Sequence, residues 1–222
     1  MSISENLLKL RSEIPDRVSI VAVSKRKSVK DILEAYNAGQ RVFGENRVQE
    51  LVEKQPLLPG DIQWHMVGHL QTNKVKYLTG FTEMIHSADS LKLLQAISQE
   101  AGKAGRIISC LLQIHIASEE SKFGFTKEEV LNLTEDPDFQ LLNNIRIAGV
   151  MGMATFTGDM DQVRSEFRYL RGVFEELKEK YFTDDQDFRE ISMGMSGDYT
   201  VAIEEGSTMI RLGTVIFGPR NY

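Results

Sequence analysis

Eight short apolar runs alternate with amphipathic segments along the sequence, and this alternation restricts the folds that the chain can adopt. The apolar runs are predicted to be β-strands: residues 19–25, 41–46, 62–67, 84–87, 107–116, 145–151, 188–193 and 208–212. The segments predicted to be helices include residues 4–13, 47–54, 72–78, 160–180 and 198–205. Strands that alternate with helices in this way indicate a parallel α/β protein.

Eight strands fit a closed (β/α)8 barrel, the TIM barrel, better than an open doubly wound sheet. The chain length of 222 residues agrees with this prediction, because such barrels need about 200 residues or more. No linker rich in Ser, Gly or Pro and no abrupt change in composition divides the sequence. We therefore predict a single domain over residues 1–222.

The charge and hydropathy of the chain argue against several classes of protein. A formal net charge of −6 disfavours general nucleic-acid binding, which needs a surplus of Lys and Arg. No run of about 18 apolar residues could span a membrane, and the start of the sequence lacks the apolar core of a signal peptide. Cys110 is the only cysteine, so no disulfide can form within one chain. We expect a cytoplasmic protein, and a monomer, because no exposed apolar stripe demands a partner.

The first predicted strand ends on Lys25, and an ammonium group at that position requires an explanation. A lysine at the end of a buried strand loses solvation, and such lysines are paired or used covalently. In (β/α)8 barrels, binding and chemistry gather at the carboxyl ends of the strands. We hypothesise that Lys25 forms a Schiff base with a carbonyl ligand such as pyridoxal phosphate. The alternative is an exposed loop residue, which is common after a strand.

Hydroxyl and glycine residues follow the last two predicted strands, where (β/α)8 barrels bind phosphate groups. Ser196 and Thr214 supply hydroxyl groups at these two strand ends. Gly197 and Gly213 would let backbone N–H groups approach an anion without an intervening side chain. The alternative is that the glycines only permit tight turns between strand and helix. Their occurrence at both strand ends favours a phosphate site.

Arg211 alternates with Met209 in the last predicted strand, so its side chain is expected to point into the barrel. A buried arginine stays charged and needs a partner, and a pyridine nitrogen is one suitable acceptor. Arginine would leave that nitrogen unprotonated, whereas a carboxylate would hold a proton on it and make the ring a strong electron sink. An arginine at this position therefore disfavours chemistry that passes through a carbanion.

Three other strand ends carry residues with two interpretations each. Asn46 could hydrogen-bond a ligand or cap the helix that follows it. Met193 could pack against a ligand ring or fill the core. His65 and His69 are four residues apart, but no third ligand follows in the usual zinc arrangement, so we predict no metal site.

Several motifs resemble those of the pyridoxal phosphate homeostasis proteins: Val23-Ser-Lys25, Phe43-Gly-Glu-Asn46, and segments within residues 64–74, 149–153 and 192–218. The resemblance follows nearly the whole chain in order. It implies a (β/α)8 barrel like the N-terminal domain of alanine racemase. It also implies Lys25 as the Schiff-base lysine, Arg211 facing the pyridine nitrogen, and phosphate held around Ser196, Gly213 and Thr214.

Members of that family bind pyridoxal 5'-phosphate and help to balance its cellular supply, without established turnover. Residue patterns and resemblance together predict these cofactor-binding residues: Lys25, Asn46, Met193, Ser196, Gly197, Arg211, Gly213 and Thr214. The sequence departs from the family pattern at His115, where Asn is usual, and at Ala154-Thr155, where Ala-Pro is common. These departures affect the shape of the open face beside the cofactor.

Three functions remain open from the sequence. The first is a homeostasis protein that holds pyridoxal phosphate and passes it to apo forms of pyridoxal-phosphate enzymes. The second is a pyridoxal-phosphate racemase or decarboxylase, and the third is a barrel enzyme acting on a phosphorylated substrate. Because the sequence ends soon after the last strand, we expect no second domain over the cofactor, and therefore no efficient catalysis. The third function lacks a carboxylate pair or a metal motif to support it.

Overall fold

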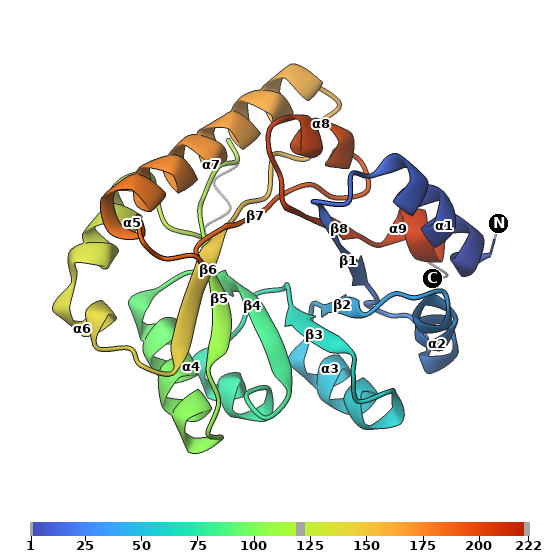
Figure 1. Cartoon of the computed structure of the whole chain (residues 1–222), viewed down its shortest axis with the longest axis horizontal. Coiled ribbons are helices and arrows are strands. Elements are labelled where there is room, and N and C mark those ends of the chain that lie inside the picture. The colour runs from blue at the N-terminus through green and yellow to red at the C-terminus, as the bar shows by residue number, and fades with distance from the viewer. Residues whose placement is uncertain (1, 119–122, 220–222) are drawn as a thin grey trace.

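Eight parallel strands form a closed barrel in a computed structural model that describes residues 2–118 and 123–219 (Figure 1). The strands follow one another around the barrel in chain order, and the last strand pairs with the first. Their bounds are β1 Ser19–Val23, β2 Val42–Glu45, β3 Gln63–Met66, β4 Thr82–Ala88, β5 Ile108–Gln113, β6 Ile145–Met151, β7 Glu190–Ser192 and β8 Met209–Leu212. The predicted (β/α)8 barrel is therefore confirmed.

Helices surround this barrel on its outside (Figure 1). The α-helices are α1 Ile3–Glu13, α2 Val29–Asn37, α3 Val48–Lys54, α4 Leu91–Lys103, α5 Lys127–Glu135, α6 Pro137–Gln140, α7 Met160–Tyr181, α8 Tyr199–Glu204 and α9 Thr214–Phe217. Two 3-10 helices, η1 Gln55–Leu57 and η2 Thr72–Tyr77, complete the set of described helices. The predicted helix at residues 72–78 is thus a 3-10 helix, and it begins without a side-chain cap.

Local sequence signals explain where several of these helices begin. Ser28 caps α2, and the Asp31 side chain bonds back to the Ser28 backbone, so each side chain accepts a hydrogen bond from the other's N–H group. Thr126 and Glu129 form the same capping box at the start of α5. Ser90 caps α4 through the Leu93 N–H group. These bonds satisfy amide groups that have no partner inside the helix, and they fix the helix starts.

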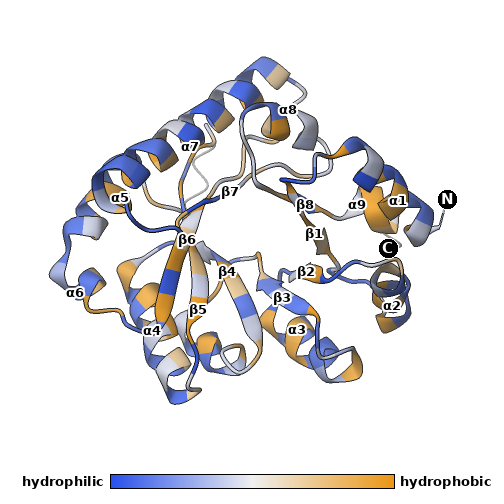
Figure 2. Ribbon diagram, viewed as in Figure 1, coloured by the Kyte–Doolittle hydropathy of each residue, from blue (hydrophilic) through white to orange (hydrophobic). Residues whose placement is uncertain are grey.

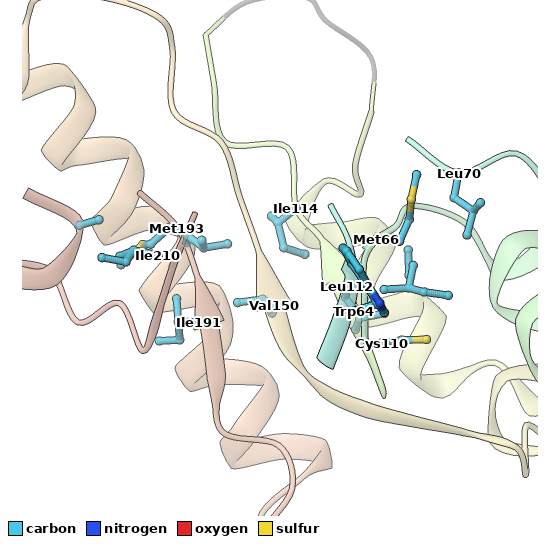
Figure 3. Close-up of a cluster of buried hydrophobic side chains, with 14 of the residues drawn as sticks. Trp64, Met66, Leu70, Cys110, Leu112, Ile114, Val150, Ile191, Met193 and Ile210 are labelled. Carbon is cyan, nitrogen blue, oxygen red and sulfur yellow. The ribbon is translucent and has the colours of Figure 1, made fainter. Parts of the chain in front are cut away.

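Side chains alternate between two buried layers, because successive residues of a strand point to opposite faces of the sheet. The smaller layer fills the barrel interior and includes Val21, Val23, Val67, Met84, Leu111, Ala148, Met151 and Met209. The larger layer lies between the barrel and the helices, and Figure 3 shows part of it, including Trp64, Met66, Cys110, Val150, Ile191 and Ile210. Hydrophobic and hydrophilic positions alternate along the outer helices (Figure 2), as expected for helices with one face on the barrel.

No helix in the described parts of the chain is both long enough and apolar enough to cross a membrane.

Gly149 marks an irregular point in the barrel wall, where β6 pairs with β5 and β7. The β5–β6 register shifts here, because Cys110 pairs with Ile147 while Leu111 pairs with Gly149. Gly149 has φ 147°, and a Cβ atom built on it would lie 1.9 Å from the Glu190 carbonyl oxygen. The position therefore requires glycine both for its backbone conformation and for its close strand contact.

We expect Gly149→Ala to lower the free energy of unfolding by roughly 3 kcal/mol, because strand separation and backbone strain add. Urea denaturation followed by circular dichroism measures this loss. Gly172→Ala is the matched control: Gly172 lies in α7, and an added Cβ would meet open space. That change should instead stabilise the protein by about 0.5–1 kcal/mol. Equal effects at the two glycines would contradict this interpretation of the β6 irregularity.

Candidate functional site

Lys25 lies at the carboxyl end of the barrel, two residues beyond the end of β1. Val21 and Val23 point into the barrel interior, and Lys25 lies in the turn that directly follows β1. Its half-buried side chain lines a small cavity of about 160 Å³ together with Arg26, Asn46, Arg47 and Glu50. The lysine singled out from the sequence therefore lies where barrels of this type bind their ligands.

A buried ion cluster braces the main chain on both sides of Lys25. Lys54, at the end of α3, donates from Nζ to the Ser24 carbonyl at 2.8 Å and to Glu45 Oε1 and Glu50 Oε1, each at 2.7 Å. Glu50 also accepts the backbone N–H of Arg26. These bonds hold both peptide neighbours of Lys25 against α3.

Arg26 adopts an unusual backbone conformation within this brace. Its φ is 60°, in the left-handed region that costs a non-glycine residue of order 1 kcal/mol. The hydrogen bond from its N–H to Glu50 holds the backbone in this conformation. Strained backbone of this kind clusters at functional sites, where surrounding contacts over-determine it. The strain here lies directly beside the lysine that defines the site.

Glu45 is fully buried, and burial raises the pKa of its carboxyl group. Hydrogen bonds from Lys54 and Ser24 and the charge of Lys54 act in the opposite direction. Its second oxygen, Oε2, has no hydrogen-bond partner among the described residues. Sequence reasoning missed Lys54, although its spacing of four residues from Glu50 in a predicted helix was the signal for an ion pair.

Asn46 faces the cavity and does not cap the next helix. The N-cap of α3 is Arg47, and no side chain makes a capping hydrogen bond there, so the capping interpretation is wrong. The loop after β3 packs directly on Asn46: a Cβ atom on Gly68 would lie 2.3 Å from the Asn46 carbonyl oxygen. Glycine at position 68 therefore allows the loop to fix the Asn46 backbone at the mouth.

The segments after β7 and β8 meet in a cup of hydrogen-bond donors. The backbone N–H of Gly213 donates to the Ser196 hydroxyl at 3.3 Å, which joins the two segments. Among the described residues, the amides of Ser196, Gly197 and Thr214 have no acceptor within the protein. Neighbouring amides that lack an acceptor within the protein are suited to bind an anion.

The two glycines of this cup are not explained by tight turns. Gly213 has φ −114°, and Gly197 is likewise outside the left-handed region. A Cβ on Gly197 would meet no protein atom within 4 Å, and one on Gly213 would lie at an ordinary 3.5 Å from the Val23 carbonyl oxygen. Neither backbone conformation nor packing requires glycine here. The space above Gly197 and the unused amide donors fit a phosphate group.

Arg211 points into the barrel, as its alternation with Met209 predicts, and is 5% exposed. Its Nη1 donates to the Ser192 carbonyl at 2.8 Å and to the Ser192 hydroxyl at 2.7 Å, while Nη2 donates to the Gly152 carbonyl at 3.0 Å. Burial lowers its pKa to about 10, and the charge of Asp198 opposes this shift. Arg211 therefore stays charged at neutral pH. Two of its five N–H groups, on Nε and Nη2, remain for a ligand.

The two histidines four residues apart do not come together. His69 Nδ1 lies 3.2 Å from Asp89, whereas His65 points into the barrel with Nδ1 2.9 Å from His86 Nε2. Within residues 2–118 and 123–219, no group of three or more His, Cys, Asp or Glu side chains could hold a metal ion. The neighbour of His65 is thus on β4, which sequence spacing did not reveal.

Met193 contributes no side chain to this mouth. It is fully buried in the layer between barrel and helices, near Ile191 and Ile210 (Figure 3). The physical reason is strand alternation: Ser192 points inward to Arg211, so the next residue points outward. We therefore leave Met193 out of the proposed site, in contrast to the prediction from sequence.

The chain matches known proteins over nearly its full length. The alanine racemase N-terminal domain family matches residues 1–221. A pyridoxal phosphate homeostasis protein from Aquifex aeolicus is 40% identical, over 91% of this chain and 87% of that protein. The chain belongs to the pyridoxal phosphate homeostasis protein family. The human member is 38% identical, over 91% of this chain and 77% of its own length.

Solved structures agree with this assignment. PipY of Synechococcus elongatus, whose structure was solved with pyridoxal phosphate (PLP) bound, is 37% identical to this chain. The two structures superpose with a TM-score of 0.88, and the match covers 98% of this chain and all of PipY. An alanine racemase from E. faecalis superposes with a TM-score of 0.71 at 18% identity and covers 98% of this chain but 58% of the racemase. That second likeness shows the fold alone. The predicted family and its alanine racemase-like barrel are both confirmed.

We expect Lys54→Met to destabilise the protein by about 3–5 kcal/mol at neutral pH, because it leaves the Glu45 carboxylate buried without a cation. Removing Lys54 should raise the pKa of Glu45 further above its unfolded value. A raised carboxyl pKa gives stability at acidic pH that is lost as the pH rises, so the deficit of the variant should shrink on acidification. Urea denaturation at acidic and neutral pH tests this.

Lys103→Met serves as the control, because Lys103 pairs with Glu100 on an exposed helix surface. Lys103→Met should lower the free energy of unfolding by less than about 1 kcal/mol at either pH. The double variant Glu45→Gln, Lys54→Met should recover part of the lost stability, since it leaves no unpaired charge at position 45. If Lys54→Met lowers the free energy of unfolding equally at both pH values, the Glu45 charge is not the cause of the loss.

Proposed function

We propose that this protein binds pyridoxal 5'-phosphate covalently through Lys25 and takes part in the cellular homeostasis of that cofactor. The observation that carries the proposal is a lysine at the same end of the barrel as a set of amide donors suited to a phosphate group. The pyridoxal phosphate bound in the PipY structure supports the same assignment. So do the names of the curated relatives, which are homeostasis proteins.

Lys25 would supply the amine that condenses with the cofactor's aldehyde, whose oxygen would leave as water. Lys54 and Glu50 hold the backbone on either side of it, so the side chain starts from a fixed point. Asn46 lines the same cavity and presents its side chain to the bound ligand. A fixed attachment point lowers the entropy lost when the covalent bond forms.

The cup formed by Ser196, Gly197, Gly213 and Thr214 holds the phosphate group. Its backbone N–H groups and hydroxyls neutralise the anion by donating hydrogen bonds, without requiring a cationic side chain. Gly213 and Ser196 are already bonded to each other, so the cup is preformed across two strand ends. Preformed donors bind a phosphate with little reorganisation.

Arg211 presents its remaining N–H groups to the ring nitrogen. When bound, pyridoxal phosphate supplies an aldehyde that reacts with amines and a ring that withdraws electrons, most strongly when its nitrogen is protonated. Arg211 keeps its own proton at neutral pH and therefore leaves the nitrogen unprotonated. This arrangement holds the cofactor but weakens the electron withdrawal that catalysis on an amino acid uses.

We therefore propose carriage and buffering of the cofactor rather than enzymatic turnover, with apo forms of pyridoxal-phosphate enzymes as recipients. We also propose that the protein acts as a cytoplasmic monomer. Racemase or decarboxylase activity finds no support of its own, because the alanine racemases resemble this chain at fold level alone. A phosphorylated substrate other than the cofactor is likewise favoured by no single observation.

Attachment to Lys25 is tested by incubating the protein with pyridoxal phosphate, reducing it with borohydride and sequencing peptides by mass spectrometry. We expect a phosphopyridoxyl group on Lys25 and its loss in Lys25→Ala. Lys27→Ala is the control, because Lys27 Nζ already donates to the Phe217 carbonyl at 3.0 Å. That variant should keep the label on Lys25. Label on another lysine, or none on the unmodified protein, would contradict the proposal.

The phosphate cup is tested by filling its open space. Gly197→Ala should leave the unfolding free energy within about 0.5 kcal/mol, because the new methyl group meets no protein atom. It should lower pyridoxal phosphate affinity about tenfold or more, since it obstructs amide donors that bind charged oxygen. Affinity for pyridoxal, which lacks the phosphate, should not change.

Gly60→Ala is the matched control for this measurement. Gly60 also has open space around it, but it precedes β3 at the opposite end of the barrel. The control should change neither stability nor affinity. Equal loss of pyridoxal and pyridoxal phosphate binding in Gly197→Ala would place the phosphate elsewhere.

A further inference from the structure

Four buried polar side chains form a continuous hydrogen-bonded chain across the barrel interior. Arg211 Nη1 donates to the Ser192 hydroxyl at 2.7 Å, and that oxygen lies 3.0 Å from His86 Nδ1. His86 Nε2 in turn lies 2.9 Å from His65 Nδ1, and the two rings are tilted by 50°. The chain thus links β8, β7, β4 and β3. Of these four residues, only Arg211 has a role in the proposed function.

The direction of every bond in this chain follows from its first donor. Arginine can only donate, so the Ser192 oxygen accepts from Arg211. The Ser192 hydroxyl hydrogen is buried and needs an acceptor, and among the described residues His86 Nδ1 is the one within reach. His86 therefore carries its proton on Nε2 and donates it to His65 Nδ1. His65 then also carries its proton on Nε2.

Both imidazoles are neutral in this arrangement. Burial lowers the pKa of His65 to about 3. Burial, and then the repulsion that a protonated ring would meet from a protonated His65 and from Arg211, lowers the pKa of His86 well below its usual value. A carboxylate in the place of either ring would attract the guanidinium and compete with a ligand for its N–H groups. Neutral rings leave the positive charge on Arg211 for the ligand.

The consequence concerns the orientation of Arg211. Because His86 takes the hydroxyl hydrogen, the Ser192 oxygen always presents a lone pair to the guanidinium. Together with the Ser192 and Gly152 carbonyls, this acceptor fixes the guanidinium plane. The N–H groups left on Nε and Nη2 then point in one direction. A hydroxyl without a fixed acceptor could instead turn its hydrogen toward Arg211 and repel it.

We propose that His86, supported by His65, is a positioning residue that orients Arg211 toward the ring nitrogen of bound pyridoxal phosphate. The proposal rests on the proposed function and adds two residues that do not touch the cofactor. A purely structural role for His86 would affect every ligand of the site equally. A positioning role affects only ligands that possess the ring nitrogen.

The experiment compares pyridoxal phosphate with its 1-deaza analogue, in which carbon replaces the ring nitrogen. We expect His86→Leu to weaken pyridoxal phosphate binding about tenfold, the value of one hydrogen bond to a charged group. Affinity for the deaza analogue should stay at its unmodified value. His86→Asn should keep most of the pyridoxal phosphate affinity that His86→Leu loses, because the Asn side-chain oxygen can accept the Ser192 hydroxyl hydrogen in the place of Nδ1. Met84→Leu, two residues earlier on β4 and also inside the barrel, should change neither affinity.

Loss of both affinities by the same factor in His86→Leu, or of neither, would overturn the positioning role. If His86→Leu does not fold, Ser192→Ala removes the hydroxyl that accepts from Arg211, a smaller change in the same hydrogen-bonded chain, and should likewise weaken binding of pyridoxal phosphate but not of the deaza analogue. Nitrogen-15 NMR of the protein without ligand should show both rings protonated at Nε2 alone. A proton on His86 Nδ1 would overturn the proposal without any ligand. Failure of the unmodified protein to bind either ligand would instead refute the proposed function.

Discussion

The hydrogen bonds that close the barrel between β8 and β1 are the constraint on which the candidate site depends. They set Val21 beside Arg211 and Ala22 beside Leu212, although nearly the whole chain separates these residues in sequence. Closure therefore brings Lys25, at the end of the first strand, to the same mouth as the cup after the last two strands. Parallel pairing places all carboxyl ends together, so the mouth gathers groups from every strand.

Two buried cations serve the site in different ways. Lys54 is balanced by the carboxylates of Glu45 and Glu50, and this ion cluster fixes the backbone around Lys25. Arg211 is held by main-chain carbonyls and one hydroxyl, which leave its positive charge available. The first arrangement suits a brace, because opposite charges neutralise each other. The second suits recognition, since an arginine without a bound carboxylate still attracts an acceptor in a ligand.

Much of this architecture could be predicted from local sequence. Apolar runs of strand length were enough to place the strands, because burial on both faces excludes polar residues from most positions. The alternation of Met209 and Arg211 correctly placed the arginine inside the barrel. The same alternation applied to Ile191, Ser192 and Met193 would have excluded the Met193 side chain. The role of Asn46 could not be predicted in this way, since a helix-capping residue and a cavity-lining residue have the same local sequence pattern.

The sequence by itself determined the order of strands and helices, the lysine at the end of β1 and the glycines after the last strands. These features depend on neighbouring residues, whose patterns of hydropathy and backbone freedom are local. Only the tertiary structure decided that Lys54 braces Lys25 and that His65 and His86 stand behind Arg211. Such contacts join polar residues on separate elements, and their formation depends on strand register and barrel closure, which no local pattern encodes.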